Sequence, residues 1–199
     1  MDRLPSLIFA LSAVLASGCR DEPATHAPPT SRVNAVMAAP PRRDAVESFC
    51  DVRAPAGQGR AFALPPLAEG TPLAARGWRW INVWATWCHP CVEELPLLVR
   101  WRSRLASDGV SIEFLSIDAA PEDVATFRSS HPGTPASLRI RDPNLLPSWL
   151  ASVGLDGGAS VPVQVFVDPA GRVRCVRSGS VTEADYATVH QLVSARAAN

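Results

Sequence analysis

The stretch Trp87-Cys88-His89-Pro90-Cys91 constrains the fold of this chain more than any other feature. Two cysteines stand two residues apart, after the β-rich apolar run 80–85 and before a helix-favouring run. The first thiol of such a pair lies at a helix N-terminus, where free backbone N–H groups and the helix dipole stabilise a thiolate. The thiolate is the nucleophilic form of cysteine. The spacing therefore predicts a redox-active pair at a strand-to-helix junction.

The two cysteines are expected to have different roles. Cys88, ahead of the helix, is the expected exposed attacking thiolate, and Cys91, one turn inside it, is the expected resolving thiol. A zinc site would need two further ligands at matching spacing, which the remaining histidines and cysteines do not supply. Haem attachment would need a histidine directly after Cys91, where Val92 stands. A static structural disulfide is the other alternative, and the helix-start position argues against it. We expect no metal and no bound cofactor.

The N-terminal residues 1–18 have the features of an export signal, with a short basic start and an apolar run over 4–16. About a dozen apolar residues suit a cleaved signal better than a membrane-spanning helix. Small residues followed by Cys19 resemble the bacterial lipoprotein box, although Leu15 stands one place earlier than the usual leucine. We therefore expect lipidation of Cys19, with a plain secretory signal or an uncleaved anchor as alternatives. Each of these takes the domain out of the cytosol.

The next segment, 19–48, holds recurrent prolines among Ala, Thr, Ser and Arg and shows no helical or strand period. Such a composition predicts a semi-extended tether, and a tail without a role would look the same. The folded domain is expected over 49–199. Lys and Arg together number 19, as do Asp and Glu, so the charge gives no sign of a nucleic-acid partner.

Within the folded domain, strands are expected to alternate with helices before a hairpin and a final helix. This order predicts an α/β fold with a central mixed β-sheet flanked by helices. The expected strands are 62–64, 78–85, 111–117, 163–167 and 172–177. The expected helices are the run from Cys91 to about Ser107, then 121–130, 145–153 and 182–197.

A longer pattern surrounds the cysteines: Trp84-Ala85-Thr86-Trp87-Cys88-His89-Pro90-Cys91-Val92-Glu93-Glu94-Leu95-Pro96. It resembles the hallmark of the TlpA/ResA-like thiol–disulfide oxidoreductases, membrane-tethered thioredoxin-fold proteins of the bacterial cell envelope. The likeness extends from about Phe62 to the C-terminus and includes Val161-Pro162 and Gly171. The resemblance implies a thioredoxin-like fold, with the CxxC pair at the N-terminus of the first main helix.

By this resemblance, Pro162 is the family's cis-proline, which faces the dithiol and lets the backbone before it pair with an extended substrate strand. From the residues alone, a proline that opens a strand is equally an ordinary trans residue. Glu94 stands at the position of the family's functional glutamate. On a helix it shares a face with Cys91, and a partly buried carboxyl with a raised pKa would take the Cys91 proton. The alternative is an exposed carboxylate favoured by the helix dipole.

Three residues beside the cysteines are expected to tune the redox pair. A protonated His89 would stabilise the Cys88 thiolate and make the disulfide more oxidising, and the alternative is a histidine that only points to solvent. Pro90 lies in the same turn, and Trp87 would form an apolar platform for substrate. Asn82 stands where thioredoxin carries a buried aspartate and is expected to be a hydrogen-bonded core residue.

Cys50 and Cys175 remain, and leftover cysteines usually pair in an oxidising compartment. The resemblance implies a structural disulfide between them, because some family members tie the N-terminal segment to the late strand in this way. Closing so long a loop would contribute on the order of 4 kcal/mol. The alternatives are free thiols, an intermolecular bridge or a second redox pair.

The resulting hypothesis is a lipid-anchored, periplasm-facing protein disulfide reductase of the bacterial envelope that works through Cys88 and Cys91. By family analogy, its substrates are disulfide-bearing proteins of cytochrome c or copper-site maturation, and a membrane electron-donor protein re-reduces it. A disulfide oxidase or isomerase is the first alternative, with His89 as its support. A copper-delivery module on the same fold and a thiol peroxidase are weaker alternatives. The copper module typically spaces its cysteines three apart and has a downstream histidine ligand.

Overall fold

The computed structural model describes residues 44–73 and 77–194 of the 199-residue chain. The expected signal segment, Cys19 and most of the expected tether lie outside the described residues. No helix in the described ranges combines the length and the apolar character that a membrane crossing requires.

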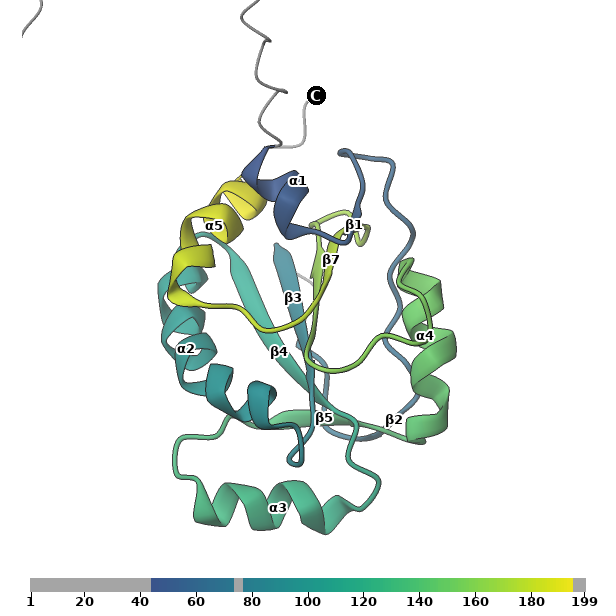
Figure 1. Ribbon diagram of the computed structural model, residues 1–199, viewed down its shortest axis with the longest axis vertical. Coiled ribbons are helices and arrows are strands. Elements are labelled where there is room, and N and C mark those ends of the chain that lie inside the picture. Colours follow the sequence, from purple (N-terminus) through teal and green to yellow (C-terminus); the bar gives the residue numbers. More distant parts are fainter. Residues whose placement is uncertain (1–43, 74–76, 195–199) are drawn as a thin grey trace, which may run out of the picture. The chain divides into compact units, whose positions relative to one another are not determined.

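A seven-stranded mixed sheet forms the frame of the described domain (Figure 1). Its strands are Val52–Arg53 (β1), Leu67–Glu69 (β2), Trp78–Trp84 (β3), Val110–Ser116 (β4), Ser137–Ile140 (β5), Val163–Val167 (β6) and Val173–Ser178 (β7). They lie in the order β1-β7-β6-β3-β4-β5-β2. The pairs β3–β4 and β4–β5 are parallel, and the other four pairs are antiparallel.

Helices cover both faces of this sheet. They are Ala45–Phe49 (α1), His89–Ala106 (α2), Pro121–Ser130 (α3), Leu146–Val153 (α4) and Tyr186–Ser194 (α5), with 3₁₀ turns at Pro143–Leu145 (η1) and Glu183–Asp185 (η2). In Figure 1, α2 and α5 lie on one side of the sheet and α4 lies on the other. The expected mixed sheet flanked by helices is therefore confirmed, with the cysteine pair at the start of α2.

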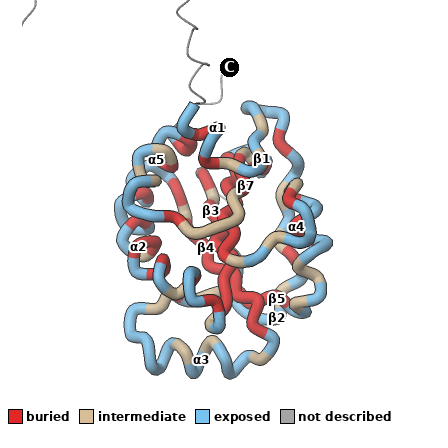
Figure 2. The backbone as a smooth tube through the Cα atoms, in the orientation of Figure 1, coloured by how far each residue is buried: buried red, intermediate tan, exposed pale blue. Residues whose placement is uncertain are grey.

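The two central strands, β3 and β4, carry the core. Both are apolar at most positions, and Figure 2 shows them buried along most of their length. Trp80, Ile81 and Val83 of β3 have no exposed surface. Continuous apolar strands are expected where both faces of a sheet are covered. This burial fixes β3 in the core, and the chain continues from β3 directly into the loop that carries the cysteine pair.

The prediction of an edge strand at 62–64 is wrong, because these residues form no strand. The residue just before this segment, Ala61, makes an isolated bridge to Arg172, and the edge strand is β2, which lies after the two prolines 65 and 66. The backbone of 62–64 bonds to a side chain instead of a neighbouring strand: the Ala63 carbonyl accepts a hydrogen bond of 2.8 Å from the Trp149 indole of α4. The prolines lack N–H groups and cannot donate to a ladder.

The packed chain begins before the expected boundary at Phe49. Helix α1 is capped by Asp44, whose Oδ1 accepts a hydrogen bond of 3.0 Å from the Val46 N–H. Val46 and Phe49 are buried, and Phe49 lies edge-on to Phe166 of β6, with ring centroids 6.0 Å apart. A helix of five residues is too short to show a hydrophobic period, and tertiary packing stabilises it. Four residues assigned to the tether thus belong to this helix.

Candidate active site

Cys88 and Cys91 form a disulfide at the start of α2. Cys88 is the N-cap residue, and its Sγ accepts a hydrogen bond of 3.3 Å from the Cys91 backbone N–H. Pro90 lies in the first turn, where a missing N–H costs no helical hydrogen bond. The first N–H groups of a helix have no intrahelical partner, so they are available to a negative charge on the Cys88 sulfur. The geometry therefore stabilises a Cys88 thiolate once the disulfide is reduced.

In the disulfide form, Cys88 is less exposed than the sequence suggested. Only 5% of its surface is accessible, and Cys91 is fully buried. The Cys88 Sγ lies 3.6 Å from the carbonyl oxygen of Val161, which lies two residues before the start of β6. The Val161–Pro162 peptide bond is cis. The backbone on the N-terminal side of Pro162 thus contacts the sulfur that the sequence identified as the attacking one.

The loop before the cysteines is held by Asp118, a fully buried carboxyl just after β4. The Thr86 hydroxyl donates to Asp118 Oδ1 at 2.7 Å, and the Thr86 backbone N–H lies 3.2 Å from both carboxylate oxygens. The Ser116 hydroxyl donates to Asp118 Oδ2, also at 2.7 Å. Hydrogen bonds to a charged acceptor are stronger than neutral ones. This carboxylate therefore fixes the loop two residues before Cys88.

Glu94 is buried in α2, one turn after Cys91, with 3% of its surface accessible. Its Oε1 accepts hydrogen bonds from Asn82 Nδ2 at 2.7 Å and Gln164 Nε2 at 3.0 Å. Its Oε2 accepts from the Val181 backbone N–H at 2.8 Å and lies 3.3 Å from Gln164 Nε2. The exposed-carboxylate alternative for Glu94 therefore does not fit its position, and Asn82 is a hydrogen-bonded core residue.

Burial raises the pKa of Glu94 above the ordinary value of 4.5, because desolvation penalises the charged form. Hydrogen bonds from Val181, Gln164 and Asn82 and the charge of Arg177 act in the opposite direction and lower the same pKa. Desolvation is the largest of these effects. A carboxyl whose pKa lies above the usual range is better matched to accept a proton near neutral pH.

The other residues beside the cysteines are exposed. Trp87 has 67% of its surface accessible, next to the nearly buried Cys88. The His89 side chain is 83% accessible, and its Nδ1 lies 3.5 Å from a carboxylate oxygen of Glu93, one turn along α2. When His89 is protonated, Glu93 is thus a nearby counter-charge. The apolar face of Trp87 is free to contact another molecule.

Cys50 and Cys175 form the second disulfide, which connects the segment after α1 to strand β7 across 125 residues. This is the pair that the sequence singled out. Cys175 is fully buried. In the described ranges, no group of three or more His, Cys, Asp or Glu side chains gathers in a way that would hold a metal ion.

Three relatives resemble the chain in sequence. The thiol:disulfide interchange protein DsbE homolog of Paracoccus denitrificans is 31% identical over 115 residues, which cover 57% of this chain and 58% of that protein. The thiol-disulfide oxidoreductase ResA of Bacillus subtilis is 26% identical over 103 residues, 52% of this chain and 54% of ResA. The thiol:disulfide interchange protein HelX of Rhodobacter capsulatus is 32% identical over 129 residues, 62% of this chain and 67% of HelX.

This chain belongs to the TlpA/ResA-like family of thiol–disulfide oxidoreductases. The match spans between about half and two thirds of each relative's length. No family model matches the chain. Among solved structures, the thioredoxin-family thiol:disulfide interchange protein of Chlorobium tepidum is similar with a TM-score of 0.54 and 22% identity, over 72% of this chain and 99% of that one. This likeness confirms the thioredoxin-like fold.

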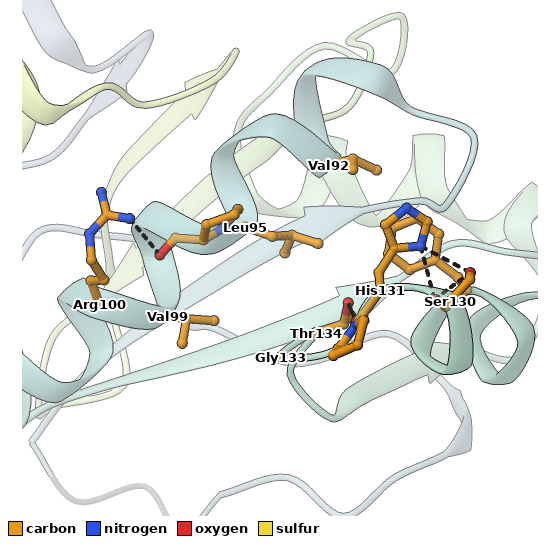
Figure 3. Close-up of a pocket in the computed structure, with 11 residues that line it drawn as sticks. Val92, Leu95, Val99, Arg100, Ser130, His131, Gly133 and Thr134 are labelled. Atoms are coloured by element: carbon orange, nitrogen blue, oxygen red, sulfur yellow. Dashed lines mark hydrogen bonds between the residues drawn. The ribbon is translucent and has the colours of Figure 1, made fainter.

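One groove of this family member runs along α2 and is not centred on the disulfide. It has a volume of about 610 Å³, and neither cysteine nor Glu94 lines it. Figure 3 shows Val92, Leu95 and Val99 of α2 on one side, with His131 and Thr134 from the segment after α3 on the other. The His131 ring stacks on Phe127, with centroids 4.0 Å apart. The groove thus begins one residue after Cys91 and extends away from the sulfur atoms.

Sequence reasoning missed two side chains of this oxidoreductase site, Gln164 and Asp118. Gln164 is the one polar residue in the apolar strand β6, and it pairs directly with Asn82 of β3. A polar residue inside a buried strand requires a hydrogen-bond partner, so this signal was present in the sequence. Asp118 follows the expected strand 111–117, and its role depends on the fold that brings β4 beside the active-site loop.

The raised pKa of Glu94 predicts a pH dependence of stability. The folded protein binds this proton more tightly than the unfolded chain, so the contribution is present below the ordinary carboxyl pKa and is lost as pH rises through the raised value. A Glu94→Gln variant stays neutral at every pH. Its free energy of unfolding relative to the wild type should therefore increase as the pH rises from acidic to neutral.

Urea unfolding of both proteins across this pH range measures the difference. Glu93→Gln, an exposed substitution on the same helix, is the control and should show no comparable trend. Parallel stability curves for Glu94→Gln and the wild type would contradict the raised pKa.

Proposed function

We propose that this chain is a thiol–disulfide oxidoreductase that reduces disulfides in partner proteins through Cys88 and Cys91. The observation that carries this proposal is the placement of the Cys88–Cys91 disulfide. One sulfur caps the N-terminus of α2, and the same sulfur lies against the Val161 carbonyl. The helix start supports a thiolate, and the adjacent backbone offers a surface for an extended substrate segment. Both features suit disulfide exchange with a polypeptide.

The first step is attack by the Cys88 thiolate on a substrate disulfide. A bond forms between Cys88 Sγ and one substrate sulfur, the substrate disulfide breaks, and the other substrate sulfur leaves as a thiolate. The N–H groups at the start of α2, including that of Cys91, stabilise the attacking anion. Trp87, exposed beside Cys88, contacts the apolar part of the substrate.

The second step releases the reduced substrate. The Cys91 thiol gives its proton to Glu94, one turn further along α2, and attacks Cys88 Sγ. The mixed disulfide breaks, the second substrate thiolate leaves, and the Cys88–Cys91 disulfide forms. Two electrons pass to the substrate. Glu94 suits the proton-accepting role because it is buried, is held by three side-chain or backbone donors and has a raised pKa.

Reduction of the Cys88–Cys91 disulfide then needs an external dithiol. By family analogy, this donor is a membrane protein, and the substrates are disulfide-bearing proteins of cytochrome c or copper-site maturation. We assign Cys50 and Cys175 to a structural role, because Cys175 is fully buried on β7.

A disulfide oxidase or isomerase is the second candidate, and His89 is the observation that favours it. A protonated imidazole beside Cys88 stabilises the thiolate and makes the pair more oxidising. The Glu93 carboxylate, 3.5 Å from His89 Nδ1, offsets part of the positive charge that a protonated His89 would present to Cys88. The reductase therefore remains the better proposal.

Single cysteine variants of the full chain test the exchange mechanism. Cys91→Ser retains the attacking thiol and lacks the resolving one, so it should accumulate a stable mixed disulfide with a disulfide-containing substrate such as insulin. Cys88→Ser should form none. Non-reducing electrophoresis and mass spectrometry detect the adduct.

The double variant Cys50→Ser/Cys175→Ser is the control, and it should turn over insulin disulfides at the wild-type rate once folded. The proposal fails if Cys91→Ser traps no adduct, or if turnover needs the Cys50–Cys175 pair.

We also propose that the domain works at the surface of a bacterial envelope membrane, on the periplasmic side, attached through lipid on Cys19. Support comes from the apolar run over 4–16 and the small residues before Cys19. One lipid-modified N-terminus would hold the redox domain near a membrane electron donor.

Labelling with a radioactive fatty acid tests the anchor. Full-length wild-type chain expressed in a bacterium should incorporate label and sediment with membranes, whereas Cys19→Ala should do neither. Equal labelling of the two proteins would contradict lipidation of Cys19.

A further inference from the structure

A buried row of amide and indole groups connects Glu94 to the middle of the sheet. Gln164 of β6 lies directly opposite Asn82 of β3, and both side chains are fully buried. Gln164 Oε1 accepts hydrogen bonds from the Trp80 indole N–H at 2.8 Å and from Asn82 Nδ2 at 3.1 Å. Gln164 Nε2 donates to Glu94. One amide thus joins an indole at one end to a carboxylate at the other.

Trp80 fixes the direction of these hydrogen bonds. An indole nitrogen is only a donor, so the Gln164 atom that faces it must be the oxygen. The Gln164 NH₂ group must then face Glu94. Because Gln164 Oε1 is an acceptor, the Asn82 atom beside it must be the NH₂ group, which also faces Glu94 Oε1. The chemistry of Trp80 therefore determines the orientation of both amides.

The result is a site that offers Glu94 only donors. Its three partners among the described residues are the amides of Asn82 and Gln164 and the backbone N–H of Val181. Asn82 faces Glu94 with its NH₂ group and not with Oδ1, the atom that could accept a hydrogen bond from a protonated carboxyl. Asn82 Oδ1 is buried and has no hydrogen-bond partner in the described part of the chain. A protonated Glu94 would direct its O–H at a donor and lose hydrogen bonds.

We propose that Gln164 is a positioning residue, held by Trp80 in the one amide orientation that presents donors to Glu94, and that this orientation keeps Glu94 ionised until Cys91 gives up its proton. This inference rests on the proposed function, because it explains how that function's proton acceptor is prepared. The hydrogen bonds of this network stabilise the ionised form of Glu94, which burial disfavours.

Other groups also face Glu94, and they are the same in the wild type and in variants of Gln164 and Trp80. Arg177 of β7 is the charged one, and its charge favours the ionised carboxyl. Its guanidinium is held by hydrogen bonds to the carbonyls of Ser180 at 3.3 Å and Phe49 at 3.1 Å. On α2 itself, Cys91 is the neighbouring titratable group once the disulfide is reduced.

Substitutions at Gln164 and Trp80 test the proposal in the oxidised full chain, where Cys88 and Cys91 do not titrate. The ¹³C signal of the Glu94 carboxyl, followed by NMR across pH, reports its protonation directly. Gln164→Leu removes the donor and should move the Glu94 titration to higher pH. Trp80→Phe frees Gln164 to turn its oxygen toward Glu94, so it should move the titration in the same direction.

The double variant separates a shared route from two independent effects. If Trp80 acts through Gln164, Trp80→Phe/Gln164→Leu should shift the titration no further than Gln164→Leu alone. Ser137→Ala is the matched control, because it removes a hydrogen bond of 3.1 Å from another buried indole, that of Trp84. It should leave the Glu94 titration unchanged. An unchanged titration in Gln164→Leu would overturn the proposal, as would full additivity in the double variant.

A kinetic measurement connects the titration to the reaction. The rate at which Cys91 resolves a preformed Cys88 mixed disulfide should fall on the acid side, and in Gln164→Leu this fall should move to higher pH. Loss of a hydrogen bond to a charged group corresponds to a rate roughly tenfold lower on the acid side. An acid side that does not move would overturn the positioning role. A Cys91→Ser chain that traps no mixed disulfide would instead contradict the proposed function, and the titration of the oxidised chain would remain interpretable.

Discussion

The antiparallel pairing of β3 with β6 is the interaction on which the site depends. Strand β3 leads into Cys88, and β6 begins just after Pro162, so their pairing brings the Val161 carbonyl against the Cys88 sulfur. The same register sets Asn82 opposite Gln164. Helix α2 packs against these strands and places the Glu94 carboxyl within hydrogen-bond distance of both amides. A slip of β6 by one residue in this pairing would turn Gln164 to the other face of the sheet, away from Glu94.

Two opposing effects act on Glu94, and their balance gives the site its chemistry. Burial disfavours the ionised carboxyl, whereas the surrounding donors and Arg177 favour it. A carboxyl exposed to water would have no reason to bind a proton near neutral pH. A buried one without donors would remain neutral and accept nothing. The row from Trp80 through Gln164 places Glu94 between these limits, one helical turn from the thiol that must lose its proton.

The sequence was sufficient for features that depend on local pattern. The CxxC pair predicted the start of α2, and the apolar run before it predicted strand β3. The helix expected over 121–130 is α3. Features that depend on long-range contact were harder. Helix α1 has too few residues to show a period, and the 62–64 segment packs on Trp149 instead of joining the sheet. Gln164 and Asp118 became meaningful only when the fold brought them to Glu94 and Thr86.

The central claim is that Cys88 and Cys91 form a reducing pair, and their midpoint reduction potential tests it most directly. The full chain would be equilibrated in thiol buffers of defined potential, and the oxidised fraction of this pair would be read by alkylation of Cys88 and Cys91. We predict a value near or below about −200 mV, in the range of protein reductants. A value near about −120 mV would place the pair with strong oxidants and contradict the proposed direction of electron flow.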